Sequence, residues 1–227
     1  MSNSPTGPWE YKGMIMEPDR RSSGNHPGII DYKGSSYVFG FNYALNLALT
    51  STHRERRSIC IAKFAYNPDG TIPTVPWFNK EGVPQVGTLN PFKRTEAETI
   101  AWESGVKTWQ SDKVGVYVTS ITNGSYIKVA GVDFGDHLAS SFTANVASGS
   151  NGSTMELHLD SIDGPVIGSL AVSSTGGWYK WQTQTTTVSG ADGVHDLYFL
   201  FKGDATGQLS NFDYWKLNKK GAKEAKL

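Results

Sequence analysis

The segment VHDLYFLFKG, residues 194–203, places apolar and polar side chains in turn along the chain. A two-residue period is typical of a β-strand with one buried face. Gly-rich turn sequences bound this segment and others that alternate in the same way: SYVFGFNY (36–43), RSICIAKFAY (57–66), GSYIKVAGVDF (124–134), SFTANVAS (141–148) and TMELHLD (154–160). Short strands at this spacing predict an all-β chain of the sandwich or barrel kind. Only residues 42–50 favour a helical turn or two.

The charge of the chain is balanced, with 21 Lys and Arg side chains against 21 Asp and Glu side chains in 227 residues. A nucleic-acid-binding protein usually concentrates basic charge on one face, and electrostatic docking on a membrane needs a polybasic segment. We therefore expect a neutral partner, and neither nucleic acid nor membrane. Cys60 is the single cysteine, so an intramolecular disulfide cannot form.

A change of composition divides the chain into parts. Residues 72–92 contain four prolines and little alternation, which predicts an extended, semi-rigid connector. We expect an N-terminal segment (1–76), a Pro-rich linker (77–92), a β-sandwich domain (93–218) and a basic tail (219–227). The first segment is short for an independent core, so it is interpreted as part of something larger.

Two carboxylates stand close together at the start of the predicted sandwich. Glu96 and Glu98 are two residues apart, so on a strand they leave the same face and repel each other. A hard divalent ion such as Ca²⁺ would relieve that repulsion, and Asp213 supplies a third carboxylate from the other end of the domain. The alternative is that Glu96 and Glu98 are ordinary solvated charges at a strand edge.

The stretch GGWYKW, residues 176–181, contains three aromatic rings behind two glycines. If residues 178–181 begin a strand, Trp178 and Lys180 share one face, and Tyr179 and Trp181 share the other. We then expect Trp178 to be held out at a loop–strand junction and Trp181 to pack inside. A neutral sugar offers an apolar CH face that an indole covers, although partial burial of Trp178 is the simpler alternative.

The segments from 93 to 218 together resemble carbohydrate-binding module family 6. The resemblance rests on RTEAETIAWESGVKT (94–108), NGSYIKVAGVDFG (123–135), STGGWYKWQT (174–183), LSNFDYWKL (209–217) and the segments between them. It implies an all-β fold, a jelly-roll β-sandwich with a structural Ca²⁺. The matching positions imply Glu96, Glu98 and Asp213 as ion ligands, with backbone oxygen from residues 108–113.

The same resemblance implies a ligand cleft among loops at one end of the sandwich. One sugar lies between two rings, which correspond to Tyr117 and Trp178, and Asn211 matches the amide that bonds sugar hydroxyls. The chain departs from the family pattern at TWQSDKVGV (108–116). There Trp109 either adds a third stacking surface or narrows the cleft.

The N-terminal segment resembles the last part of a glycoside hydrolase family 43 β-propeller. The matching stretches are GPWEYKGMIMEP (7–18), NHPGIIDYKGSSYVFGF (25–41) and RRSICIAKFAYNPDGTIPTV (56–75), about one to two blades. That family acts on xylan, arabinoxylan and arabinan side chains with an Asp base, a second Asp and a Glu acid. Glu17, Asp19 and Asp31 stand in no matching catalytic motif, so no catalytic residue is assigned. His26 and Arg57 match active-site surroundings and are interpreted as vestigial.

An incomplete propeller leaves apolar side chains unpaired. We expect Tyr37, Phe39, Phe41, Ile59 and Ile61 to be covered by docking on the sandwich domain of a monomer, or by a second chain in a homodimer. The parent protein is expected to be extracellular, although no signal peptide occurs in this chain.

The sequence thus predicts a non-catalytic module that binds xylan, arabinoxylan or xylo-oligosaccharides. The alternatives are a glycosidase of the arabinofuranosidase or xylosidase type that is active only within a longer or oligomeric enzyme, a module for cellulose or β-glucan, and an interaction domain for another protein.

Overall fold

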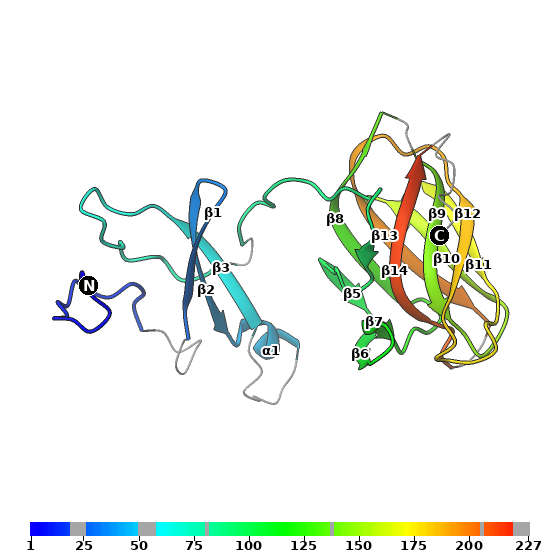
Figure 1. The fold of residues 1–227 in the computed structure, drawn as a ribbon, viewed down its shortest axis with the longest axis horizontal. Coiled ribbons are helices and arrows are strands. Elements are labelled where there is room, and N and C mark those ends of the chain that lie inside the picture. The colour runs from blue at the N-terminus through cyan, green and yellow to red at the C-terminus, as the bar shows by residue number, and fades with distance from the viewer. Residues whose placement is uncertain (19–25, 50–57, 80–81, 137–138, 205–206, 220–227) are drawn as a thin grey trace. The chain divides into compact units, whose positions relative to one another are not determined.

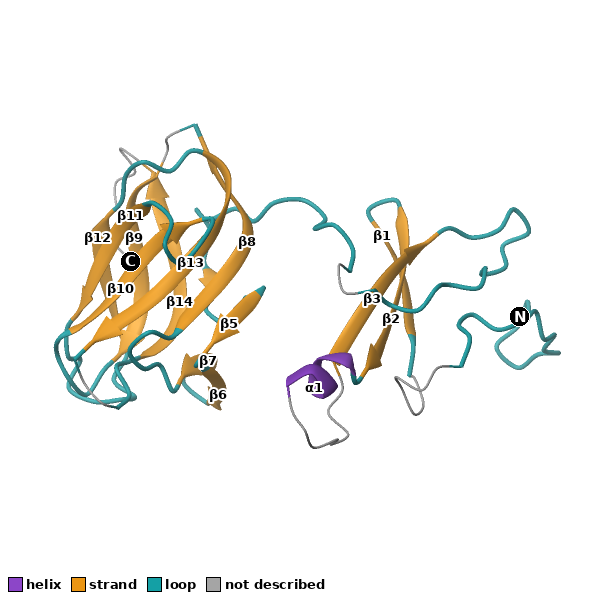
Figure 2. Ribbon diagram, turned by 180° about the vertical axis from the view of Figure 1, so that it is seen from behind, coloured by secondary structure: helices purple, strands orange, loops and turns teal. Residues whose placement is uncertain are grey.

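The computed structural model describes residues 1–18, 26–49, 58–79, 82–136, 139–204 and 207–219, and these form two compact units, Met1–Val86 and Gly87–Leu227. The predicted all-β class is confirmed, because the regular structure of both units consists of β-strands apart from one short helix among the described residues (Figures 1 and 2). The residues 220–227 of the predicted basic tail lie outside the described residues. Within the described ranges no helix is long and apolar enough to cross a membrane.

Unit 1 contains a three-stranded antiparallel sheet in the order β1-β2-β3. Its strands are β1 (Gly28–Tyr32), β2 (Ser35–Asn42) and β3 (Ser58–Phe64), and the predicted helical turn is α1 (Ala44–Leu49). Lys33 and Gly34 join β1 to β2 with φ of 47° and 75°, the left-handed conformation that a two-residue hairpin loop needs. One face of the sheet packs Val38 and Phe64 against Val75 and Phe78.

The other face of this sheet is partly open within unit 1. Tyr37 and Phe41 are buried, whereas Ile59 is 86% exposed and Phe39 is 38% exposed. Of the apolar residues predicted to be covered, Tyr37 and Phe41 are therefore buried within the described part of unit 1, whereas Phe39 and Ile59 are exposed there.

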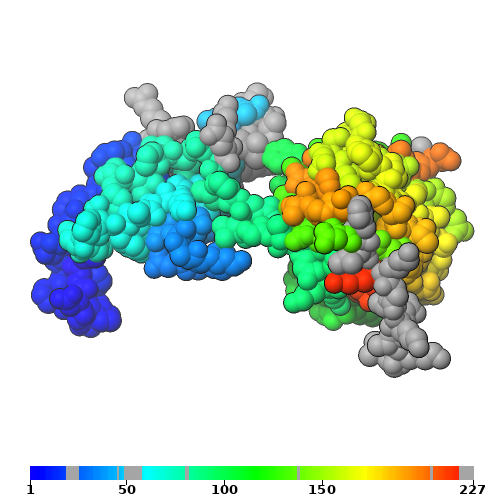
Figure 3. Space-filling view, turned by 90° about the horizontal axis from the view of Figure 1, so that it is seen from above, coloured from blue at the N-terminus to red at the C-terminus, as the bar shows by residue number. Residues whose placement is uncertain are grey.

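Unit 2 is a sandwich of two antiparallel sheets (Figure 1). One sheet has the order β11-β10-β13-β8-β5, and the other has the order β12-β9-β14-β7-β6 with β4 paired to β14. The bounds are β4 (Thr95–Glu96), β5 (Trp102–Ser104), β6 (Lys107–Ser111), β7 (Gly115–Thr119), β8 (Tyr126–Gly135), β9 (Ala139–Ala147), β10 (Ser153–Leu159), β11 (Val166–Val172), β12 (Gln182–Thr187), β13 (Gly193–Gly203) and β14 (Asn211–Lys219). In the space-filling view the yellow and orange segments of unit 2 lie against each other (Figure 3).

The core between the two sheets follows from the alternation seen in the sequence. On β13, Leu197, Phe199 and Phe201 are all buried, and they belong to one hydrophobic cluster of unit 2. The ring of Phe199 lies 5.3 Å from Trp215 and 5.6 Å from Phe212, both on β14. These edge-to-face contacts join the two sheets through their aromatic side chains.

The stretch predicted as a linker packs at both of its ends. Trp77 and Phe78 contribute to the apolar packing of unit 1. Leu89 forms a β-bridge to Val132, and the Pro91 carbonyl accepts a hydrogen bond of 2.7 Å from the Leu217 amide. The division between the units at residues 86 and 87 falls inside residues 77–92.

Replacing Phe199 tests the aromatic core. Phe199→Ala is expected to lower the free energy of unfolding by about 3–5 kcal/mol, because it removes a buried ring that contacts both sheets. Urea denaturation measures this change. Val194→Ala, on the same strand but 53% exposed, is the control and should change stability by less than about 0.5 kcal/mol. Equal effects of the two substitutions would contradict this account of the core.

Candidate functional site

Residues 177–180 form a turn, so the expectation that residues 178–181 begin a strand is wrong. The Lys180 amide donates to the Gly177 carbonyl over 3.1 Å, and β12 begins only at Gln182. Gly176 and Gly177 have φ of 84° and 155°, a backbone region that other residues rarely adopt. The two glycines therefore start a tight turn and place Trp178 and Tyr179 at its two central positions.

Trp178 is half-buried at this turn, and its indole lies against the backbone of Gly149. A Cβ atom at position 149 would come within 2.8 Å of the ring, so a larger residue there would displace Trp178. Tyr179 is 64% exposed. One ring therefore leans on the loop after β9, while the next ring stays open to solvent.

Asn211 fixes the peptide that joins these two rings. It is 1% exposed at the start of β14, and its Nδ2 donates to the Trp178 carbonyl over 2.6 Å. Its Oδ1 accepts hydrogen bonds from Thr119 Oγ1 at 2.7 Å and from Gln208 Nε2 at 2.5 Å. The amide predicted to bond sugar hydroxyls is thus used to hold the turn against β7 and β14.

Tyr117, predicted as a sugar platform, is only 2% exposed. The ring of Trp181 covers it in an edge-to-face contact with 5.2 Å between centroids. Burial raises the pKa of the Tyr117 phenol, and an electrostatic contact with Tyr179 adds to the rise. Trp181 was expected in the core, but it is half-buried and packs on Tyr117, outside the hydrophobic cluster between the sheets.

Trp109 stands on the β6–β7 hairpin beside this group of rings. It is the cross-strand partner of Tyr117, so the two side chains leave the same face of the sheet. Trp109 is 68% exposed. These five rings are the candidates for lining the cleft predicted from the sequence, and we use the name aromatic cleft for Trp109, Tyr117, Trp178, Tyr179 and Trp181.

The predicted metal ligands lie at the junction of β4 and β14, where Tyr214 pairs with Glu96. The Arg94 guanidinium binds both carboxylate oxygens of Glu96, at 2.8 and 2.9 Å, and lies 3.8 Å from Asp213 Oδ2. Asp213 Oδ2 also accepts a hydrogen bond from Asn145 Nδ2 at 2.8 Å. Among the described residues, no three His, Cys, Asp or Glu side chains converge into a metal cluster.

Two buried carboxylate oxygens at this junction are unsatisfied within the described part of the chain. Glu98 Oε2 and Asp213 Oδ1 are buried and have no hydrogen-bond partner among the described residues. Burial raises the pKa of Glu98, and the neighbouring negative charges of Glu96 and Asp213 raise it further. Burial likewise raises the pKa of Asp213, although the hydrogen bond from Asn145 acts to lower it. Two of the three predicted ligands thus fit a hard divalent ion, whereas Glu96 would have to be released by Arg94.

The ionisable residues of unit 1 form no comparable site within its described residues. Glu17 and Asp31 are exposed, and His26 stacks on Phe41 with 6.4 Å between ring centroids. Asp19 and Arg57 lie outside the described residues.

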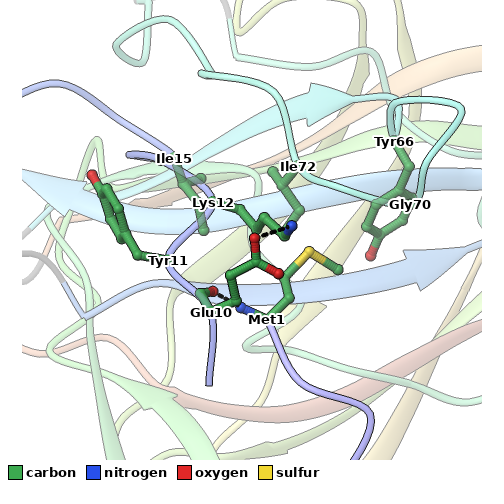
Figure 4. A pocket seen from close by; sticks show the side chains of 9 residues that line it. Met1, Glu10, Tyr11, Lys12, Ile15, Tyr66, Gly70 and Ile72 are labelled. Carbon is green, nitrogen blue, oxygen red and sulfur yellow. Dashed lines mark hydrogen bonds and ion pairs between the residues drawn. The ribbon is translucent and has the colours of Figure 1, made fainter. Parts of the chain in front are cut away.

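A pocket of 240 Å³ in unit 1 is lined mainly by apolar atoms (Figure 4). At its rim Lys12 pairs with Glu10 over 2.6 Å, and the Met1 amino group bonds the Glu10 carbonyl. Glu10 is the one acidic side chain among the residues that line the pocket, so the pocket offers no pair of carboxylates for acid–base chemistry.

The fold and the aromatic cleft define a β-sandwich with open aromatic rings at its loops, an arrangement suited to sugars. A family model described as carbohydrate binding module (family 6) matches residues 96–219, and this chain belongs to that family.

Relatives with known names match both units. Arabinoxylan arabinofuranohydrolase of Bacillus subtilis (strain 168) is 41% identical over 228 residues, which cover 96% of this chain and 44% of the relative. A solved structure of a glycoside hydrolase family 43 arabinoxylan arabinofuranohydrolase from Bacillus subtilis, in complex with cellotetraose, is similar with a TM-score of 0.89. It is 41% identical and covers 96% of this chain and 46% of that chain. The chain thus spans less than half the length of these relatives, and the predicted resemblance of unit 1 to family 43 is confirmed.

Two isolated family 6 modules resemble unit 2. One, from Clostridium cellulolyticum in complex with xylose, is 37% identical with a TM-score of 0.55, covering 58% of this chain and all of that chain. The other is a β-1,3-glucan-binding module from Bacillus halodurans, 33% identical with a TM-score of 0.55, covering 58% of this chain and 98% of that chain. The predicted jelly-roll β-sandwich is confirmed by these similarities.

Sequence reasoning missed Tyr179 in the cleft and Gln208, which supports the cleft through Asn211. Tyr179 was assigned to the covered face of a strand, although two adjacent glycines also signal a turn that exposes both central residues. Gln208 lies in the loop before β14, and no sequence pattern points to its contact with Asn211.

Asn211 is expected to stabilise the protein as well as the cleft. Asn211→Ala removes three hydrogen bonds and leaves the Trp178 carbonyl and the Gln208 amide without that partner, at a cost of about 1–3 kcal/mol in the free energy of unfolding. Urea denaturation followed by fluorescence measures the cost. The control is Asn123→Ala, which removes one exposed bond to the Gly203 amide and should cost less. An unfolding curve of Asn211→Ala that matches the unsubstituted protein would contradict the network.

Proposed function

We propose that this chain binds neutral plant cell-wall polysaccharide, xylan or arabinoxylan, without catalysing its cleavage. The observation that carries the proposal is the turn at residues 177–180, which presents Trp178 and Tyr179 beside the covered pair Tyr117 and Trp181. Flat rings stack on the CH faces of sugars, and nearby amides bond their hydroxyls. The balanced charge of the chain agrees with an uncharged ligand.

The relatives support xylan as the first candidate ligand. A family 6 module similar to unit 2 was solved with xylose, and the longer relatives are named for arabinoxylan. Cellulose and β-1,3-glucan are the second candidates, because one relative was solved with cellotetraose and another similar module is described as binding β-1,3-glucan. A few stacked sugars give a dissociation constant of roughly micromolar to millimolar, or about −8 to −4 kcal/mol.

Cleavage of arabinoxylan belongs to the longer relatives, and we assign no catalytic residue to this chain. Plant cell-wall polysaccharides lie outside the cell that degrades them, so we propose an extracellular site of action. An assay with aryl arabinofuranoside and aryl xyloside separates binding from catalysis. Turnover above background by the purified chain would overturn the non-catalytic assignment.

We also propose that Glu98 and Asp213 hold a structural Ca²⁺ at the junction of β4 and β14, with Glu96 joining when Arg94 releases it. The two buried oxygens without partners support this, since Ca²⁺ prefers several carboxylate and carbonyl oxygens. Backbone oxygens of residues 108–113 would complete the shell. The ion would neutralise the buried carboxylates at the junction where the first and last strands of unit 2 pair.

Truncation of Trp178 tests the proposed ligand cleft. Trp178→Ala is expected to weaken binding of xylotetraose at least tenfold, about 1.4 kcal/mol, because it removes a stacking surface. Calorimetric titration measures the affinity, and a panel of xylan, arabinoxylan, cellulose and laminarin identifies the ligand.

The matched control is Trp102→Ala. Trp102 is 56% exposed on β5 of the other sheet and should leave affinity unchanged. Loss of binding in Trp102→Ala together with full binding in Trp178→Ala would place the ligand elsewhere and contradict the proposal.

Calcium is expected to raise the melting temperature. An ion at 100 times its dissociation constant adds about 2.7 kcal/mol to the free energy of unfolding. Because the folded protein raises the pKa values of Glu98 and Asp213, the ion-free protein should lose stability as pH rises from about 4 toward 7. Calcium should therefore stabilise more at pH 7 than at pH 4.5.

Differential scanning calorimetry with and without a chelator measures these shifts. Glu98→Gln is the control variant: it removes a buried charge, so its stability should depend less on both calcium and pH. An identical response of Glu98→Gln and the unsubstituted protein to calcium would contradict the assignment of Glu98 as a ligand.

A further inference from the structure

The chain contains two Asn-Gly pairs, and both begin the same triplet, Asn-Gly-Ser. Asn123 and Gly124 lie in the turn before β8. Asn151 and Gly152 lie in the loop before β10, and all four residues are exposed. Glycine has no side chain to shield its amide nitrogen from the side-chain carbonyl carbon of the preceding residue. Both pairs therefore hold the two atoms of an intramolecular reaction between side chain and backbone.

The side chains of the two asparagines are held in the same manner. Asn123 Oδ1 accepts a hydrogen bond from the Gly203 amide over 3.1 Å, and Asn151 Oδ1 accepts one from the Ser174 amide over 2.7 Å. A backbone N–H aimed at a carbonyl oxygen stabilises negative charge that develops on that oxygen. Both side-chain carbonyls are therefore activated toward attack at carbon, and the shorter hydrogen bond belongs to Asn151.

The glycine amides of the two pairs differ. The Gly124 amide donates a hydrogen bond of 2.8 Å to the Phe201 carbonyl. The Gly152 amide donates to no acceptor among the residues that the structure describes. An amide nitrogen attacks a carbonyl carbon only after it gives up its proton, so a hydrogen bond made through that proton must break first. The folded chain therefore protects Asn123 and leaves Asn151 open to reaction.

Asn151 belongs to a loop that supports the turn of the aromatic cleft. The same loop, residues 148–152, contains Gly149, against which the Trp178 indole lies. Ser174, whose amide bonds Asn151, belongs to the segment that leads into the turn. A longer backbone at position 151 would therefore displace both contacts between this loop and the segment that carries Trp178.

We propose that Asn151 deamidates spontaneously in the folded chain, with water as the co-reactant, and that the reaction weakens sugar binding. The Gly152 nitrogen bonds to Asn151 Cγ, the Cγ–Nδ2 bond breaks, and ammonia leaves with the former amide proton of Gly152. Water then opens the resulting succinimide ring at either carbonyl, which gives aspartate or isoaspartate. Isoaspartate routes the backbone through the side chain and so lengthens it. The effect on binding rests on the proposed function, whereas the reaction itself does not.

Peptide mass spectrometry during storage in mildly alkaline buffer measures the reaction. Trypsin places the two sites on separate peptides, residues 114–128 and 129–180, so both rates come from the same sample. In the folded chain Asn151 should react about twofold to tenfold faster than Asn123, the factor that corresponds to the one hydrogen bond at Gly124. In urea the two rates should become equal, because the two triplets are identical.

Equal rates at the two sites of the folded chain, or a faster reaction at Asn123, would overturn the assignment of Asn151. Fragment ions separate Asn151 from Asn145, which lies on the same peptide. Rates that stay unequal in urea would also overturn the assignment, because the difference would then not come from the fold.

Calorimetric titration with xylotetraose measures the effect on binding. The fraction of chains that bind should fall as isoaspartate accumulates. Asn151→Gln is the matched control: its longer side chain cannot form the succinimide ring, so storage should leave its own initial binding unchanged. Full binding by a sample in which isoaspartate has replaced Asn151 would overturn the effect on binding. Absence of sugar binding by the fresh chain would remove the proposed function and this effect, whereas the measured rates still decide the reaction at Asn151.

Discussion

The buried hydrogen bond from Asn211 to the Trp178 carbonyl is the contact on which the candidate site depends. It connects the last strand of the sandwich to the turn, whose Gly177 amide also donates to the Ser148 carbonyl over 3.3 Å. Thr119 and Gln208 hold the other end of the same amide, so β7, β14 and the turn share one network. A buried amide whose hydrogen bonds are satisfied has a fixed orientation. It therefore fixes the peptide between Trp178 and Tyr179, to which it donates a hydrogen bond.

Five consecutive residues of β14 contribute to the turn, to the core and to the carboxylate junction. Asn211 holds the turn, Phe212 and Trp215 are completely buried in the core, and Asp213 provides a buried carboxylate. Strict alternation would send Phe212 and Trp215 to opposite faces, but the register shifts between Phe212 and Tyr214. This bulge lets both rings face inward and leaves Asp213 beside Arg94 and Asn145. The core, the cleft and the carboxylate junction are therefore coupled through one irregularity of the backbone.

The sequence predicts the fold better than it predicts the site. Alternation identified β10 and β13 correctly, because burial between two sheets imposes a two-residue period. The same rule failed at residues 178–181. Gly176 and Gly177, which have positive φ, start a turn there, so the two-residue period of a strand does not apply. The burial of Tyr117 under Trp181 is a contact between residues 64 positions apart, which no local pattern encodes. Resemblance to the family indicated Trp178 and Asn211, but only the structure shows that Asn211 positions the turn.

The most direct test of this account follows the indole N–H signals of the tryptophans by NMR while xylotetraose is added. The account predicts ligand-dependent shifts for Trp178 and Trp109, which line the aromatic cleft. Trp215 in the core and Trp102 on the other sheet should keep their positions. Shifts of Trp102 without shifts of Trp178 would contradict the central claim that the turn held by Asn211 presents the sugar-binding rings.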